Sequence, residues 1–316
     1  MKVLANDGIS QSGIDELEKS GFEVSTTTVA QKQLTNYINE NNVDVILVRS
    51  ATTVRKELID ACPNLKIIGR GGVGMDNIDV DYAIKKGIKV INTPAASSHS
   101  VAELVFAHLF GLARYLHNAN RDMPLEGDSK FKDLKKAYAK GTELKGKTIG
   151  VFGFGRIGQA TAKVALGAGM KVIAYDPFIE KANLELSFFD GQKLNFTINT
   201  VSKEEVLKQS DFITLHVPAQ KDYVIGKAEF ELMKDGVIIA NAARGGVIDE
   251  VELVQAISNG KVARAALDVF ENEPKPEIQL LMNPALSLTP HTGAATNEAQ
   301  DRIGLELASQ IIDILR

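Results

Sequence analysis

Arg244, Glu273 and His291 are the residues of this sequence best suited to chemistry on a small acid. A histidine has an ordinary pKa of about 6.5, so it can accept a hydroxyl proton while a hydride leaves the neighbouring carbon. A carboxylate beside the ring would stabilise the imidazolium, and the planar fork of an arginine suits a substrate carboxylate. These residue types indicate hydride transfer between a 2-hydroxy acid and a nicotinamide cofactor. Glu271 is an alternative to Glu273 as the carboxylate.

Each of the three residues follows an apolar run that is typical of a buried strand. These runs cover residues 237–240, 263–267 and 286–288. In an open parallel sheet, ligands bind beyond the carboxyl ends of the strands. We therefore expect Arg244, Glu273 and His291 to meet at one edge of a sheet, next to the cofactor.

A glycine motif of the form G-x-G-x-x-G indicates the cofactor; it consists of Gly153, Gly155 and Gly158 and follows an apolar strand. The first glycine permits a tight turn, the second lets the backbone approach a pyrophosphate, and the third lets helix and strand pack closely. After a helical run, the next strand, residues 170–175, ends in Asp176. A carboxylate there binds the adenosine ribose and repels a 2′-phosphate, so the motif predicts NAD rather than NADP.

Further predicted cofactor contacts lie around this motif and at the ends of later strands. They are Arg156, Ile157, His216, Val217, Pro218, Ala242 and Gly293. For His216, packing within the domain is an equal alternative to contact with the adenosine.

Composition and charge argue against several other classes of protein. The 316 residues have a net charge of −4, which disfavours a general affinity for nucleic acid. Cys62 is the only cysteine, so a reducing, cytoplasmic location is expected. The longest apolar stretch, residues 104–113, is too short to cross a bilayer, and no membrane partner is predicted. The histidines at 99, 108 and 117 alternate between helix faces, so no metal site is predicted.

Alternating strand and helix patterns predict an α/β protein with two doubly wound parallel-sheet domains. We expect a smaller, flavodoxin-like substrate domain made of residues 1–97 and 293–316, and a Rossmann NAD-binding domain made of residues 98–292. The helix at 101–112 is apolar on nearly every side, so it should be buried all round, between domains or subunits. The glycine-rich stretch 69–74 is either a turn or a loop whose N–H groups hold a carboxylate.

Over nearly its full length the sequence resembles the D-isomer-specific 2-hydroxyacid dehydrogenases. The matching stretches are residues 153–158, 241–246, 267–274 and 290–296. The resemblance implies that His291 is the acid/base, that Glu273 supports its protonated form and that Arg244 orients the substrate. It also implies that Asp268 lies at the nicotinamide, that Asp176 binds the ribose, and that a homodimer forms through the segment between the domains.

Within the family, residues 48–52, 72–77 and 92–94 are most similar to the D-3-phosphoglycerate dehydrogenases. This similarity implies oxidation of 3-phospho-D-glycerate to 3-phosphohydroxypyruvate, the first step of serine biosynthesis. The partner would be a phosphorylated 2-hydroxy or 2-oxo acid. The residues implied at the substrate are Arg49, Ser50, Val73 and Gly74, together with Arg244 and His291.

Two departures from that similarity affect the choice of substrate and of control. Residues 95–98 lack an asparagine that is common in that loop, and no regulatory domain follows the last helix, so control by serine is not expected. The nearest alternative is a glyoxylate or hydroxypyruvate reductase or another D-2-hydroxyacid dehydrogenase. The alternative from another class is an NAD(H)-sensing, corepressor-like binding protein. Lys135, Lys136 and Lys140 are interpreted as a solvated basic face rather than as phosphate ligands.

Overall fold

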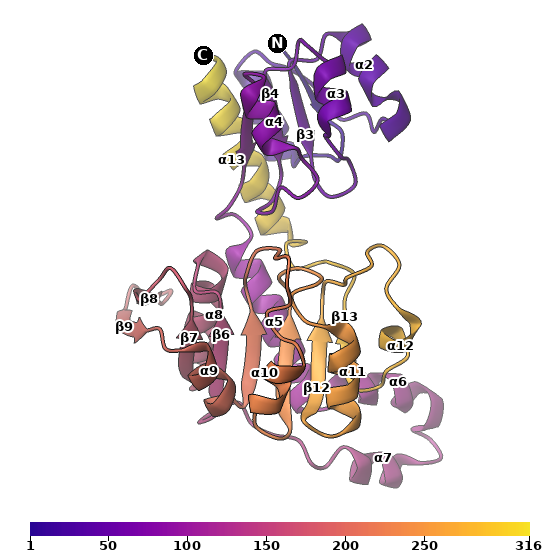
Figure 1. Ribbon diagram of the computed structural model, residues 1–316, viewed down its shortest axis with the longest axis vertical. Helices are drawn as coiled ribbons and strands as arrows, with labels where there is room; N and C mark the ends of the chain where they lie inside the picture. Colours follow the sequence, from indigo (N-terminus) through magenta and orange to yellow (C-terminus); the bar gives the residue numbers. More distant parts are fainter. The chain divides into compact units, whose positions relative to one another are not determined.

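The computed structural model describes all residues, 1–316, and divides into two compact units. Unit 1 contains residues 1–100 and 294–316, and unit 2 contains residues 101–293. Each unit is built on its own parallel sheet (Figure 1). The predicted fold class, two parallel-sheet α/β domains, is thus confirmed.

Unit 1 has a five-stranded sheet with the order β2-β1-β3-β4-β5, which is the flavodoxin-like order. Its strands are β1 (Lys2–Ala5), β2 (Glu23–Ser25), β3 (Val45–Val48), β4 (Ile67–Arg70) and β5 (Lys89–Asn92). Its helices are α1 (Gln11–Lys19), the 3-10 turn η1 (Gln31–Gln33), α2 (Leu34–Asn41), α3 (Lys56–Ala61), α4 (Val80–Lys85) and α13 (Asn297–Leu315).

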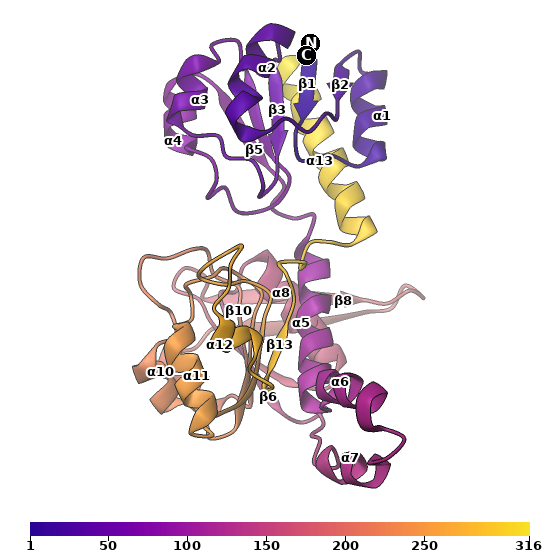
Figure 2. The same ribbon diagram turned by 90° about the vertical axis from the view of Figure 1, so that its right-hand side faces the viewer.

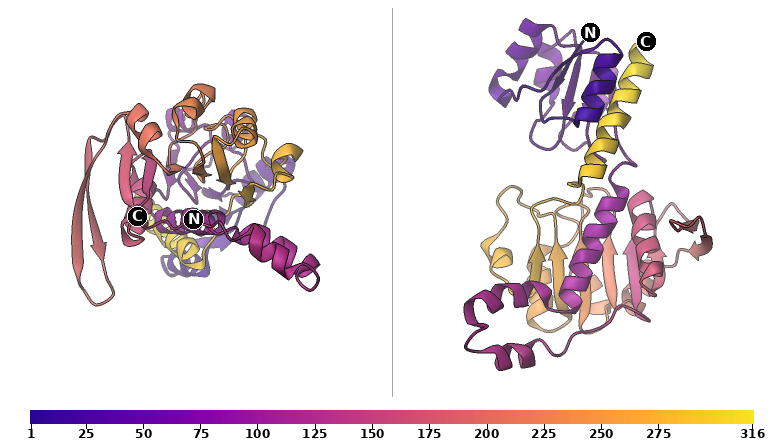
Figure 3. Two further views of the ribbon diagram at one scale, coloured as in Figure 1. Left: turned by 90° about the horizontal axis from the view of Figure 1, so that it is seen from below. Right: turned by 180° about the vertical axis from the view of Figure 1, so that it is seen from behind.

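Side chains in the central strands of unit 1 alternate between two apolar layers, as the period of a strand requires. Val45 and Leu47 of β3 pack with α1 and α13, whereas Ile46 and Val48 pack with α2, α3 and α4. The C-terminal helix α13 lies beside α1 (Figures 2 and 3). The two helices cross closely at Gly13 and Gly304. A Cβ atom at Gly13 would lie only 2.8 Å from the carbonyl carbon of Gly304, so there is no room for a side chain at the crossing.

Unit 2 has a six-stranded parallel sheet with the order β13-β12-β11-β10-β6-β7. Its strands are β6 (Thr148–Phe152), β7 (Lys171–Tyr175), β10 (Phe212–Leu215), β11 (Val237–Asn241), β12 (Val262–Leu267) and β13 (Leu286–Leu288). Its helices are α5 (Ser98–Ala113, which begins in unit 1), α6 (Leu116–Glu126), α7 (Phe131–Ala137), α8 (Arg156–Gly167), α9 (Lys203–Gln209), α10 (Lys227–Leu232), α11 (Glu250–Ser258) and α12 (Ile278–Leu281).

Helices cover both faces of the sheet in unit 2. Helices α5 and α8 pack on one face, and α9 to α12 pack on the other (Figures 1 and 3). Strand β6 pairs with β7 on one side and with β10 on the other, so the order of the strands reverses at β6. Ligands of open α/β sheets bind beyond the carboxyl ends of the strands at such a switch point.

An antiparallel hairpin interrupts the Rossmann pattern after β7. It consists of β8 (Lys181–Ser187) and β9 (Lys193–Asn199), which pair only with each other, and it runs outward past α8 (Figure 2). Thr200 then forms one parallel bridge with Ala174 of β7, at the place of a further strand. The apolar side chains of the hairpin face α8 at its base, whereas the Phe189 side chain at its tip is fully exposed.

Helix α5 is less enclosed than its sequence predicts. Its residues 103, 107 and 110 form an exposed stripe, and the Phe110 side chain is 48% exposed. The expectation that this helix is buried all round is therefore wrong for a single chain. Cys62 is fully buried in unit 1, which agrees with its interpretation as a small apolar residue. None of the helices combines the length and the apolar character that a membrane span requires.

Candidate active site

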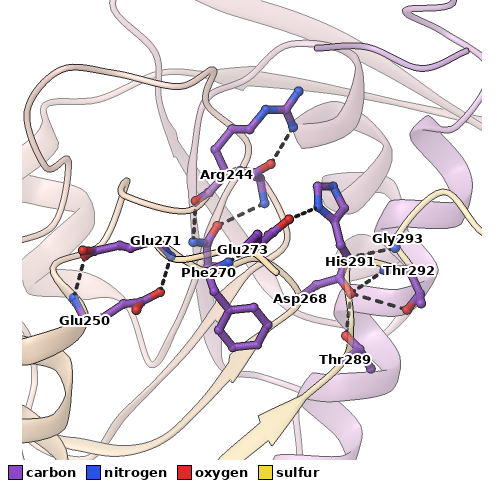
Figure 4. Close-up of polar contacts among 12 residues, drawn as sticks. Arg244, Glu250, Asp268, Phe270, Glu271, Glu273, Thr289, His291, Thr292 and Gly293 are labelled. Atoms are coloured by element: carbon purple, nitrogen blue, oxygen red, sulfur yellow. Dashed lines mark hydrogen bonds and ion pairs between the residues drawn. The ribbon is translucent and has the colours of Figure 1, made fainter. Parts of the chain in front are cut away.

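The carboxyl ends of β11, β12 and β13 bring the predicted catalytic residues to one edge of the sheet in unit 2 (Figure 4). His291 Nδ1 lies 2.9 Å from Glu273 Oε2, and the other oxygen, Oε1, accepts a 3.0 Å hydrogen bond from the N–H group of Phe270. An ionised carboxylate can only accept hydrogen bonds, so Nδ1 carries the hydrogen of this contact. The pairing leaves Nε2 of His291 as the nitrogen that can exchange a proton with a substrate.

Glu271, the alternative carboxylate, is engaged in a different contact. Its Oε1 accepts a 3.2 Å hydrogen bond from the N–H group of Glu250, and Glu250 Oε1 accepts a 2.8 Å bond from the N–H group of Glu271. This reciprocal pair ties the start of α11 to the loop after β12. Burial, together with the neighbouring carboxylates led by Glu271, raises the pKa of Glu250. The structure thus places Glu273, and not Glu271, beside His291.

The loop that carries Arg244 is fixed by its neighbours in sequence. The side-chain amide of Asn241 donates to the carbonyl of Arg244 at 2.9 Å, and its oxygen accepts from the N–H group of Ala243 at 3.0 Å. A Cβ atom at Gly245 would lie 1.9 Å from the carbonyl oxygen of Phe270, so only glycine lets the two loops approach this closely. The guanidinium group of Arg244 extends to the same side of the loops as the His291 ring (Figure 4).

Asp268 organises the loop that carries His291. Its carboxylate is almost fully buried and accepts hydrogen bonds from the Thr289 hydroxyl at 2.6 Å and from the N–H groups of Thr292 and Gly293 at 2.7 and 2.8 Å. His291 itself has a backbone φ of 55°, in the left-handed region that a bulky side chain rarely adopts. These hydrogen bonds stabilise that conformation from both sides of the residue.

The glycine motif lies at the start of α8, where its members meet different constraints. Gly153 has a φ of 85°, and a Cβ atom there would lie 2.5 Å from the carbonyl oxygen of His216. A Cβ atom at Gly158 would lie 2.1 Å from the carbonyl oxygen of Gly153. Gly155 has no atom within 4 Å of such a position, so the backbone is open there to a ligand.

The first turn of α8 carries no side-chain cap. Its N-cap residue is Gly155, whereas α11 is capped by Asp249, which accepts from two backbone N–H groups of its first turn. The uncapped N–H groups of α8, with the positive end of the helix dipole, suit a pyrophosphate. Arg156 is exposed at this turn and Ile157 is half-buried.

Asp176 is placed where the motif predicts the ribose acid. Its Oδ2 accepts from the N–H group of Phe154 at 2.7 Å, and its Oδ1 accepts from those of Phe178 and Ile179 at 2.9 and 3.1 Å. A carboxylate offers about four acceptor positions, so one remains for a ribose hydroxyl. The residues fit an NAD molecule that lies across the glycine loop.

His216 follows β10 at the switch point, next to Val217 and Pro218. Its Nε2 lies 3.1 Å from the Thr214 hydroxyl, and its Nδ1 is buried without a partner. Burial lowers the pKa of His216 to about 3. The ring is therefore neutral in the folded protein, and Nδ1 is a candidate for contact with the adenosine.

The predicted substrate residues Arg49 and Ser50 lie at the carboxyl edge of the sheet in unit 1. Asp7 accepts hydrogen bonds from the N–H group of Arg49 at 2.6 Å and from the Thr52 hydroxyl at 2.6 Å. The side chain of Asn77 donates to the Arg49 carbonyl at 2.7 Å. Burial lowers the pKa of the Arg49 guanidinium, and the nearby Asp7 opposes this shift. The loop that carries Arg49 is thus fixed by side chains of other elements.

The second predicted substrate loop, with Val73 and Gly74, follows β4 in unit 1. The side chain of Asn92 donates to the carbonyl of Val73 at 2.7 Å, which fixes the loop to the end of β5. In unit 2, Lys135, Lys136 and Lys140 are all exposed.

Comparison with known proteins shows the family of the chain. Residues 106–293 match the profile of the D-isomer specific 2-hydroxyacid dehydrogenase, NAD binding domain. The chain belongs to the D-isomer specific 2-hydroxyacid dehydrogenase family. Both the predicted family and NAD as the cofactor are confirmed, and the matched stretch covers most of unit 2.

The chain is similar to members of the family that carry different substrate names. The chain is 42% identical to a D-3-phosphoglycerate dehydrogenase of Archaeoglobus fulgidus over 320 residues, which is 100% of this chain but 58% of the relative. It is 44% identical to a hydroxypyruvate reductase of Thermotoga maritima, over 98% of this chain and 97% of the relative. A D-lactate dehydrogenase of Aquifex aeolicus, solved in complex with NAD and lactic acid, is similar with a TM-score of 0.75 and 29% identity, over 100% of this chain and 95% of that one.

The family assignment gives Asp176 a direct test. Replacement of Asp176 by serine should narrow the preference for NADH over NADPH about tenfold or more, because the repulsion of a 2′-phosphate and the acceptor for the ribose hydroxyls are both lost. The ratio of the Kd values for NADH and NADPH, measured by fluorescence titration, checks this. Asp235→Ser, at an exposed position in unit 2, is the matched control. An unchanged ratio in Asp176→Ser would contradict the ribose role.

His216 should make the protein sensitive to acid. Its pKa is about 3 when folded and near the ordinary 6.5 when unfolded, so between these values the unfolded chain binds more protons and stability falls as the pH falls. In the unchanged protein, His216 should lower the free energy of unfolding by up to about 1.4 kcal/mol for each pH unit between about pH 6 and pH 4, and His216→Gln should abolish this contribution. Urea unfolding at a series of pH values measures it, with the exposed His99→Gln as control. If the free energy of unfolding depends on pH in the same way for His216→Gln and for the unchanged protein, the prediction is wrong.

Three features of this site were not found from the sequence. Glu250 follows Asp249 at a helix start and resembles an ordinary acidic first turn. Asp268 was expected to contact the nicotinamide, and its additional role in holding the 289–293 loop depends on contacts distant in sequence. His108 has no predicted role at the site, yet it is buried and lies within hydrogen-bond distance of Ser287 and Thr289. The available signal was its position on a helix that is otherwise apolar.

Proposed function

We propose that the protein catalyses NAD-dependent oxidation of 3-phospho-D-glycerate to 3-phosphohydroxypyruvate, and the reverse reduction. The observation that carries the reaction type is the 2.9 Å contact between His291 Nδ1 and Glu273 Oε2 at a sheet edge that also holds Arg244. The substrate is supported by 42% identity to D-3-phosphoglycerate dehydrogenases of Archaeoglobus fulgidus and Methanocaldococcus jannaschii over the full chain. The chain spans about three fifths of the length of these relatives.

The proposed roles follow from the chemistry of each group. Nε2 of His291 takes the proton of the substrate hydroxyl, and Glu273 stabilises the resulting imidazolium through Nδ1–H. Arg244 binds the substrate carboxylate with its planar fork. A bound NAD would be held by the glycine motif and Asp176 and would supply the hydride acceptor. Arg49 and Ser50 are proposed to hold the phosphate, and the N–H groups of Val73 and Gly74 the carboxylate.

A hydroxypyruvate or glyoxylate reductase is the second candidate. The hydroxypyruvate reductase of Thermotoga maritima matches this chain along nearly its whole length, whereas the D-3-phosphoglycerate dehydrogenases extend well beyond the match. The chemistry at His291 would be the same for both substrates. The difference would lie in whether the substrate carries a phosphate for Arg49.

Turnover measurements separate these candidates. NADH oxidation should be followed with phosphohydroxypyruvate, hydroxypyruvate, glyoxylate and pyruvate, and we expect the highest kcat/KM for phosphohydroxypyruvate. A preference for hydroxypyruvate or glyoxylate would contradict the substrate and support the second candidate. NADH binding without turnover of any of these acids would contradict the enzymatic function and favour an NAD(H)-sensing binding protein.

We also propose that the protein is a homodimer. Helices α5, α6 and α7 expose large apolar side chains, namely Phe110, Leu116, Leu125 and Phe131, at 48%, 56%, 79% and 57%. These side chains follow one another along three consecutive helices, and an exposed apolar surface of this kind supports an interaction site. Light scattering of the purified protein tests this, and a monomeric mass would contradict it. The cytoplasmic location stays a prediction.

A further inference from the structure

We propose that Ser287, His108, Thr289 and Asp268 form one directed chain of hydrogen bonds that holds the loop carrying His291. In this chain His108 is a positioning residue for the reaction. The inference rests on the proposed function, because these hydrogen bonds matter for the reaction only if His291 is the acid/base group.

His108 lies on α5 and is nearly buried, with 7% of its surface exposed. Its Nδ1 is 2.9 Å from the hydroxyl of Ser287 on β13, and its Nε2 is 3.0 Å from the hydroxyl of Thr289, directly after that strand. Both ring nitrogens therefore have a partner. A helix residue that packs on a sheet is most often apolar, so a polar side chain with two partners at this position calls for an explanation.

The direction of every hydrogen bond in the chain follows from its last member. The Asp268 carboxylate can only accept, so the Thr289 hydroxyl, 2.6 Å away, donates to it. The Thr289 oxygen then accepts from Nε2–H of His108, and Nδ1 of the neutral ring accepts from the Ser287 hydroxyl. Burial lowers the pKa of His108 against the opposing charge of Asp268, which agrees with a neutral ring that carries one hydrogen.

The chain ends on the backbone around His291. The same Oδ1 of Asp268 that accepts from Thr289 also accepts from the N–H group of Thr292 at 2.7 Å, and Oδ2 accepts from that of Gly293 at 2.8 Å. The carbonyl oxygen of Asp268 accepts from the N–H group of His291 at 2.8 Å. Asp268 thus stabilises the left-handed backbone of His291, with its φ of 55°.

His108 holds the Thr289 side chain in place against Asp268. With leucine at position 108, the oxygen of Thr289 loses its donor, and the Thr289 side chain loses one of the two contacts that fix its position. Asp268 would then hold the loop less firmly, and Nδ1 of His291 would meet Glu273 less often. A small displacement of an acid/base group lowers the rate of the chemical step more than it weakens binding.

The test compares His108→Leu with His108→Gln, because glutamine can still donate to Thr289. We expect His108→Leu to lower kcat about tenfold while KM for NADH changes less than about twofold. The pH at which kcat is half-maximal should also shift, because the Glu273–His291 contact is weakened. His108→Gln should restore most of the rate. The matched control is His117→Leu, the same substitution at a histidine that takes no part in this series of hydrogen bonds.

Each result either supports or overturns the proposal once turnover of the unchanged protein has been shown. If His108→Leu has the kcat and pH profile of the unchanged protein, the proposal is wrong, even if its melting temperature falls, since that pattern is purely structural. If His108→Leu does not fold, His108→Gln and Thr289→Val take its place, and equal rates for these two variants would overturn the proposal.

A second readout does not depend on activity. Spectra of protein labelled with ¹⁵N in its five histidines should show a neutral His108 with the hydrogen on Nε2 at about pH 7. A hydrogen on Nδ1, or a doubly protonated ring, would overturn the directed chain. If the unchanged protein turned over none of the acids tested, the proposed function would fail, whereas this measurement would still decide the geometry.

Discussion

Replacement of His291 by alanine is expected to lower kcat for reduction of the 2-oxo acid by about 10²–10⁴, while the Kd for NADH stays nearly constant. The reason is that Nε2 is the ring nitrogen left to exchange the proton, because Nδ1 is engaged with Glu273 at 2.9 Å. Steady-state kinetics and titration of NADH fluorescence measure the two quantities separately.

The control for this prediction is Glu273→Gln, which keeps the shape of the partner and removes its charge. It should lower kcat less than His291→Ala does, and it should move the pH profile, because a neutral amide stabilises the imidazolium less than a carboxylate. Normal turnover by His291→Ala would show that another group is the acid/base and would remove the main support for the proposed function.

Replacement of Arg244 by lysine should lower kcat/KM for the 2-oxo acid by about 10²–10³, although the charge is kept. Arginine can hold a carboxylate through two parallel N–H donors, and lysine offers only a point charge. Arg244→Ala should lose at least as much, mainly through a higher KM. Initial rates over a range of substrate concentrations give both parameters.

Arg55→Lys provides the comparison for Arg244→Lys. Arg55 forms a half-exposed ion pair with Asp79 in unit 1, so its replacement should leave the kinetics unchanged. Equal kcat/KM values for Arg244→Lys and the unchanged protein would contradict a two-donor contact with the substrate carboxylate.

Much of the fold follows from local patterns in the sequence. The apolar run at 286–288 matches β13, and the run at 237–240 matches β11 to within one residue. Such segments have apolar residues at the period of their element, and turns or caps mark their ends. Thr296, whose side chain accepts from the N–H group of Ala299, is one such cap.

The hairpin β8–β9 was missed, although its signals are present. Its apolar residues alternate with polar ones along both strands, and Asp190-Gly191 stands between them, which is a strong turn signal. An alternating series of strands and helices, as in the rest of the chain, predicts no hairpin at this point. Helix α6 was missed for another reason, since Pro124 within it and its polar composition favour a loop.

Only part of the candidate site could be predicted from local patterns in the sequence. The residues that stand directly after strands could be predicted, because a parallel sheet brings those positions to one edge. The residues that hold them could not, since Glu250 and His108 reach their partners through contacts between distant parts of the chain. Glu271 and Glu273 are equivalent in the sequence, and only the path of the loop after β12 distinguishes them.

The bridge between Thr200 and Ala174 has a consequence for protein engineering. Strand β7 is an outer strand of its sheet, and backbone groups left open on such a strand invite other molecules to add to it and aggregate. Thr200 and the N–H group of Val201, which donates to the Ala174 carbonyl at 2.8 Å, protect part of this strand. The hairpin tip around Phe189 can therefore be shortened without loss of solubility, whereas a deletion that reaches Thr200 should promote precipitation.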